Sequence, residues 1–173
     1  MILQYLSDIH LEFQRGHRPR PGDPCFEHIP ETIADAVILA GDIDTKLRGI
    51  DWAIAESQRL AKAILYVFGN HEFYGDSITH MVDKARARCV GTGVQVLEKD
   101  AVIIGSTRVL GCTLWSDFLL NNRFAISLQE VREGMNDYRR IRFGPAYHRL
   151  NPMKVAELHA DARNWLESHL TGR

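Results

Sequence analysis

The chain has 173 residues, of which 45% are hydrophobic and 25% are charged, and these proportions are those of ordinary soluble domains. They exclude collagen-like, mucin-like and wholly disordered proteins. The length predicts a single domain over residues 1–173, with a core that needs neither a disulfide nor a structural metal. Lys and Arg total 21 and Asp and Glu total 22, so no net charge attracts the whole protein to nucleic acid or to an anionic membrane.

The cysteines indicate a reducing location. They are Cys25, Cys89 and Cys112, and their odd number, wide spacing and lack of a CxxC pair argue against a disulfide framework and a thiolate zinc site. We therefore expect a cytoplasmic protein. The start of the chain lacks the basic segment of an export signal, and no stretch approaches the ~18 apolar residues of a membrane span, so we expect neither feature.

Three short apolar runs, rich in Ile, Leu and Val, predict buried strands at residues 2–6, 36–40 and 64–68. Between the second and third runs, apolar residues recur at helical spacing over residues 47–61, with charges on the opposite face. A strand, a helix and a strand in succession are typical of a parallel sheet.

A helix from Asp76 or Ser77 to about Cys89 is expected next, with one of the two polar residues as its cap. The chain then changes character, because strand-like runs follow one another closely and predict an antiparallel meander. These runs cover residues 94–97, 102–105 and 107–112. The predicted fold class is therefore a layered α/β fold, in which parallel strand-helix-strand units precede a strand meander.

The last third of the chain is predicted to contain two helices and one long loop. Residues 122–135 have a helical pattern, whereas residues 138–149 are basic, aromatic and without periodicity, which is typical of a loop. Asn151 followed by Pro152 is a good cap and first-turn pair for a final amphipathic helix.

Residue types that ligate metals follow each of the first three predicted strands directly. The three groups are Asp8-Ile-His10, Gly41-Asp42 and Gly69-Asn70-His71-Glu72. The carboxyl ends of parallel strands form one ligand crevice, so these groups should converge in space. Carboxylate, imidazole and amide oxygen suit a divalent cation. Asp42 can bridge two ions through its two oxygens, and Asp8 and His10 can reach the same ion.

Each group has a simpler interpretation when taken alone. A D-x-H sequence is most often a turn acid beside a surface histidine, and Gly-Asn can be a left-handed turn that ends a strand. All three groups in order, each at a strand end, favour a metal-centred site.

The ordered groups resemble the motifs of the calcineurin-like metallophosphoesterases: D-x-H, G-D-x-x-D, G-N-H-[DE], a later His and G-H-x-H. The resemblance covers residues 1–72 and implies hydrolysis of phosphate esters at a centre of two divalent ions such as Mn, Fe or Zn, with an activated water as nucleophile. It also implies that Asp8 and His10 hold one ion, that Asp42 bridges and that Asn70 holds the other. His71 matches the histidine that contacts the scissile phosphate and assists the leaving group, and Glu72 would do no more than orient it.

The chain departs from the family pattern at two points. Thr45 stands where the second motif ends in Asp, and the later His and the G-H-x-H have no counterpart. His148, His159 and His169 are the remaining downstream histidines, but none follows a predicted strand. We therefore expect the chain to be the N-terminal part of a longer enzyme, with an incomplete site that binds its two ions only in part. The alternative is a non-catalytic scaffold or partner-binding module with a vestigial metal site.

A cationic aromatic segment is a candidate for substrate binding. Arg139, Arg140 and Arg142, with His148, can meet the phosphate of an ester substrate through charge-assisted hydrogen bonds. A solvated loop, whose arginine stems cover apolar surface, explains the same residues. Strands missing from a truncated domain would leave an unpaired sheet edge, so we also expect association into a homo-oligomer through that edge.

Overall fold

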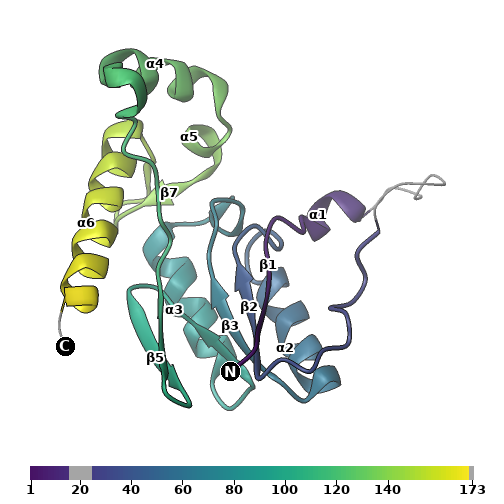
Figure 1. The fold of residues 1–173 in the computed structure, drawn as a ribbon. Coiled ribbons are helices and arrows are strands. Elements are labelled where there is room, and N and C mark those ends of the chain that lie inside the picture. The colour runs from purple at the N-terminus through teal and green to yellow at the C-terminus, as the bar shows by residue number, and fades with distance from the viewer. Residues whose placement is uncertain (16–24, 172–173) are drawn as a thin grey trace.

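The computed structural model describes residues 1–15 and 25–171. At its centre lies a parallel sheet with strand order β1-β2-β3-β4 (Figure 1). The strands are β1 (Leu3–Leu6), β2 (Ala36–Ala40), β3 (Ala63–Val67) and β4 (Val94–Val96). In register, Leu3 pairs with Ala36, and Ala36 with Ala63. The three predicted strands are therefore present, and the layered α/β fold class is confirmed.

Two helices connect the strands and cover one face of the sheet. They are α2 (Arg48–Leu60) and α3 (Ile78–Cys89), and they contact each other, as expected for successive crossovers of the same hand. The core beneath them is made of alternate strand residues, among which Val37, Leu39, Ile64 and Tyr66 are fully buried. Of the residues whose spacing predicted α2, Ile50 and Ser57 are buried, and Leu47 and Ile54 pack against the core.

The predicted meander is wrong for its first strand. β4 lies parallel to β3 in the main sheet, because α3 returns the chain to the start of the sheet before β4 begins. β5 (Asp100–Ile104) and β6 (Thr107–Gly111) do form an antiparallel pair. They turn at Gly105, whose φ is +59°.

The C-terminal third forms an arm beside the sheet, in which α4 (Phe124–Gly134) contacts α6 (Pro152–Thr171) (Figure 1). The cap of α6 is as predicted, because Asn151 Oδ1 accepts the backbone N–H of Lys154 at 2.9 Å. The prediction of a loop over residues 138–149 is wrong. This segment contains α5 (Asp137–Arg140) and a small hairpin of β7 (Arg142–Phe143) and β8 (His148–Arg149), elements too short to leave a periodic signal.

Three further short helical elements complete the described chain: α1 (Leu11–Gln14), η1 (His71–Phe73) and η2 (Leu120–Asn122). Ser77 occupies the predicted N-cap position of α3, but its side chain makes no capping hydrogen bond. Asp76 Oδ1 instead accepts the N–H of Ser77 at 2.7 Å. No helix among the described residues is long and apolar enough to cross a membrane. β1 lies at one edge of the sheet, and association through that edge stays a prediction.

Candidate metal centre

The chain leaves β1 and β2 through neighbouring loops that carry the predicted ligands. The N–H of Asp8 donates to the carbonyl of Gly41 at 3.0 Å, and the N–H of His10 to that of Asp42 at 3.0 Å. These bonds continue the pairing of the two strands beyond their ends. Asp8, His10 and Asp42 each offer a ligand atom, and these atoms all lie within 4.8 Å of one another. The structure therefore brings these three predicted ligands together.

All three residues have left-handed backbone conformations. Their φ angles are +54° for Asp8, +49° for His10 and +54° for Asp42. Asp and His adopt this region more readily than most residues, but each still does so at a cost of order 1 kcal/mol. Such conformations persist where the surrounding structure imposes them, and they concentrate at functional sites.

Two glycines allow the loops after β2 and β3 to touch through their backbones. A Cβ on Gly41, whose φ is +91°, would lie 2.6 Å from the nitrogen of Gly69. A Cβ on Gly69 would lie 2.7 Å from the nitrogen of Asp42. Any side chain at either position would force the loops apart, so the two glycines fix how closely Asp42 approaches the third motif.

Glu72 braces the same two loops from inside the protein. It is fully buried, and its carboxylate accepts four hydrogen bonds, from the backbone N–H groups of Asp42 (3.1 Å), Ile43 (2.9 Å) and Gly69 (2.9 Å) and from the hydroxyl of Tyr66 (2.9 Å). Burial raises the pKa of Glu72, although the N–H of Ile43 and the Tyr66 hydroxyl oppose the rise. The family resemblance implies that Glu72 only orients His71. In the structure, its hydrogen bonds to Asp42, Ile43 and Gly69 join the second motif to the third.

Asn70 is held by a residue from the distant arm. Its Nδ2 donates to Asp137 Oδ1 at 2.9 Å, and the hydroxyl of Tyr74 donates to the same oxygen at 2.7 Å. A carboxylate only accepts, so the amide nitrogen must face Asp137 and Oδ1 of Asn70 is left for another partner. Asp137 is 4% exposed and comes from α5, 67 residues further along the chain. No local pattern in the sequence marks it.

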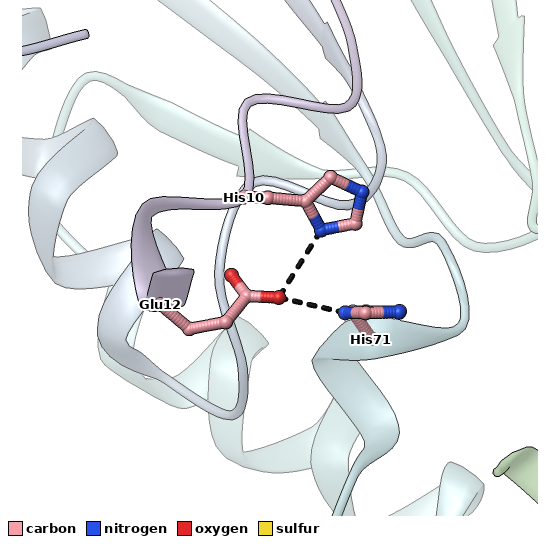
Figure 2. Close-up of side chains that lie close together, drawn as sticks. All are labelled: His10, Glu12 and His71. Atoms are coloured by element: carbon pink, nitrogen blue, oxygen red, sulfur yellow. Dashed lines mark hydrogen bonds and ion pairs between the residues drawn. The ribbon is translucent and has the colours of Figure 1, made fainter. Parts of the chain in front are cut away.

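His71 and His10 share one carboxylate oxygen. Glu12 Oε1 lies 2.6 Å from Nδ1 of His71 and 3.1 Å from Nδ1 of His10, and the second nitrogen of each ring points away from Glu12 (Figure 2). The backbone N–H of His71 donates to Asp42 Oδ1 at 2.9 Å. The ring of Tyr74 is stacked on that of His71 with 4.4 Å between centroids. The proposed catalytic histidine is thus fixed beside the predicted ligands.

Glu12 was not among the sequence candidates, although it lies only two residues after His10. Burial would raise the pKa of Glu12, but hydrogen bonds from His71 and His10 and its own backbone N–H outweigh burial, so the pKa is lowered. Its other oxygen, Oε2, is buried without a hydrogen-bond partner among the described residues. The sequence signal that could have identified Glu12 is an acidic residue in the turn that follows D-x-H.

These residues fit a divalent cation. A histidine that ligates a metal commonly donates its other ring N–H to a carboxylate. His10 has this arrangement if Nδ1–H bonds to Glu12 and Nε2 faces Asp8 and Asp42. Two carboxylates and an imidazole make a donor set for Mn, Fe or Zn. His10, Glu12 and His71 form a second group with ligand atoms within 4.8 Å, and this group shares His10 with the first.

The structure places the substrate-binding candidates in two locations. Arg139, Arg140 and Arg142 line a hollow beside Tyr74, next to the ring that stacks on His71. His148 is exposed on β8, against Phe143, and is not among the residues of that hollow.

The other two downstream histidines lie on α6. Nδ1 of His159 lies 2.5 Å from the carbonyl oxygen of Trp115, and Nδ1 of His169 lies 2.8 Å from that of Trp165. Neither histidine belongs to a group of potential metal ligands among the described residues.

Comparison with known proteins identifies the fold. No protein-family model and no curated protein matches the chain. Among solved structures, it is similar to the crystal structure of the phosphopantetheinyl hydrolase PptH from Mycobacterium tuberculosis, with a TM-score of 0.64 and 18% sequence identity. The match covers 96% of this chain and 63% of that chain, so the chain spans less than two thirds of that protein. The shared feature is the layered α/β fold.

Proposed function

We propose that this chain carries the metal site of a hydrolase that cleaves phosphate esters with the help of two divalent ions. This proposal rests on the observation that Asp8, His10 and Asp42 place their ligand atoms within 4.8 Å of one another, at the carboxyl ends of adjacent parallel strands. This is where α/β sheets bind ligands. The similarity to a protein named as a phosphopantetheinyl hydrolase supports a hydrolase.

Asp8, His10 and Asp42 would hold the first ion, and Asp42 and Asn70 Oδ1 the second. When bound, such ions activate water and neutralise the charge that develops on a phosphoryl group. Asp8 and Asp42 supply negative charge for the ions, Glu12 orients His10, and Asp137 orients Asn70. The second ion has fewer protein ligands here, so we expect it to bind more weakly than the first.

His71 would act on the substrate. Its Nδ1 faces Glu12, and because a carboxylate accepts, this contact keeps a proton on Nδ1. Nε2 is then the nitrogen left to face the substrate, and in the imidazolium form, in which both ring nitrogens carry protons, it would donate to a phosphoryl oxygen or protonate the leaving group. General acid catalysis of this kind contributes roughly 10² to 10⁴-fold to a rate.

Metal binding and turnover test the proposal together. Calorimetry with Mn²⁺ should show a site in the wild type that is lost in Asp42→Asn and retained in Asp51→Asn, which changes an exposed carboxylate on α2 paired with Arg88. Turnover of an aryl phosphate and of an aryl phosphodiester should require the metal. A chain that binds no Mn²⁺ would contradict the proposal and leave the non-catalytic scaffold as the better account, whereas chelator-resistant turnover would point to a nucleophile on the protein.

A further inference from the structure

A cluster of cationic side chains lies beside the candidate metal centre. Thr45, Tyr74, Gly75, Arg139, Arg140 and Arg142 line an open hollow of about 390 Å³, which we call the arginine hollow. Its walls come from two loops at the strand ends and from α5 with the segment that follows it. There is room for a phosphate or carboxylate group together with part of the molecule that bears it.

The positive charge of the arginine hollow is not neutralised within the described structure. Among the described ion pairs, none includes Arg139, Arg140 or Arg142. Arg139 donates to the carbonyl of Glu133, and Arg142 to those of Arg139 and Ile141. A guanidinium has five N–H donors, so each of these side chains retains donors for an anion.

The carboxylates near the hollow already have partners. Asp76 pairs with Lys84 at 2.6 Å, and Asp44 pairs with Arg48 at 3.2 Å. A further cation lies beside Gly75, because the ammonium of Lys46 would be 3.3 Å from a Cβ placed on that residue. An anion that enters the hollow therefore meets cations without displacing an internal carboxylate.

Backbone hydrogen bonds fix the walls of the hollow. The N–H of Gly75 donates to the carbonyl of Arg140 at 2.9 Å, and the N–H of Arg142 to that of Asp76 at 2.9 Å. Ile141, between the arginines, is fully buried. The arginine stems thus start from a rigid frame, which lowers the entropy cost of ordering them around an anion.

Tyr74 connects the hollow to the candidate active site. The guanidinium of Arg140 lies 5.2 Å from the centre of the Tyr74 ring, and that ring lies 4.4 Å from the ring of His71. Arg140 in the hollow and the proposed catalytic histidine therefore both contact the same ring. We propose that the arginine hollow binds a second anionic group of the substrate, apart from the phosphate that is cleaved. This rests on the proposed function and narrows the substrate to phosphate esters with a further phosphate or carboxylate.

Titration of metal-free protein with inorganic phosphate tests the hollow without the metal site. With a chelator present, calorimetry should detect phosphate binding by the wild type. Arg140→Gln with Arg142→Gln should weaken it roughly tenfold to hundredfold, the effect of losing charge-assisted hydrogen bonds. Asp42→Asn should leave it unchanged, and so should Arg163→Gln, a control on α6. No binding by the wild type, or binding that depends on Asp42 instead of the arginines, would overturn the proposal.

Kinetics then show whether the anion belongs to the substrate. We would compare two aryl phosphodiesters with Mn²⁺, one bearing a single negative charge and one bearing an additional phosphate group. Arg140→Gln should raise the KM of the second substrate roughly tenfold or more and leave the first nearly unchanged, with little effect on kcat. An equal effect on both substrates would mean that the hollow binds the cleaved phosphate, and would refute the proposal. If neither substrate is hydrolysed, the proposed function fails, and arginine-dependent phosphate binding would still support the hollow as an anion site.

Discussion

Replacement of Glu72 by alanine is expected to destabilise the protein strongly, although Glu72 ligates nothing. Its carboxylate accepts hydrogen bonds from three backbone N–H groups, one buried and two partly buried, and from the hydroxyl of Tyr66. Each buried donor left without an acceptor costs about 1–3 kcal/mol. The three N–H groups alone therefore predict a loss of roughly 3–9 kcal/mol in the free energy of unfolding, with the lower values applying if water enters the space. That is a large fraction of the roughly 5–15 kcal/mol of a typical domain.

Urea denaturation of the Glu72→Ala variant measures this loss. Glu130→Ala is the matched control, because it removes an exposed glutamate from α4 and should change stability by less than about 0.5 kcal/mol. Mn²⁺ binding should fall with stability in the Glu72 variant, since the loops that bear Asp42 and Asn70 lose their common brace. A Glu72→Ala protein within about 1 kcal/mol of the wild type would refute the argument that this carboxylate holds the loops together.

Three further outcomes are expected. Glu12→Gln should weaken Mn²⁺ binding roughly tenfold to hundredfold, as the loss of a carboxylate behind a ligating histidine usually does, and unchanged affinity in calorimetry would contradict that role. Asp42→Asn should abolish phosphodiester turnover more completely than His71→Ala, because Asp42 would serve both ions whereas His71 adds only general acid catalysis; the reverse order would argue against the two-ion mechanism. Burial tends to raise the pKa of Glu56, but hydrogen bonds led by that from Arg59 lower it below 4.5, so its contribution to stability is present above about pH 4.5 and is lost as the pH falls below that value. Acid unfolding of Glu56→Gln should therefore show a shallower loss of stability than the wild type, and an identical slope would contradict this.

The strands and helices that the sequence predicted correctly share a strong local signal. β2 coincides with a run of five apolar residues, and α2 with residues at helical spacing, of which Ile50 and Ser57 are buried. β4 has the same kind of local signal, but the antiparallel pairing predicted for it was wrong, because it lies parallel to β3. Whether a strand joins a parallel sheet or a hairpin depends on where the preceding helix returns the chain, and three residues do not encode that.

The candidate site divides in the same way. The convergence of Asp8, His10 and Asp42 could be predicted because each follows an apolar strand, and parallel strands end together. Asp137 could not, because its contact with Asn70 exists only once the arm has folded against the sheet. Glu72 was visible as a residue, but its role depends on complete burial, and an acidic residue in a polar motif gives no sign of that.

The way the site is built distinguishes it from an ordinary cluster of turn residues. Asp8 and Asp42 are like charges whose ligand atoms lie close together, and both have positive φ angles. Each of these two features costs free energy, and neither contributes to packing of the hydrophobic core. The contact between Gly41 and Gly69, the buried carboxylate of Glu72 and the bond from Asn70 to Asp137 hold this arrangement in place. In the proposed function, these contacts would order the ligands before a cation binds, so that little further ordering would oppose its binding.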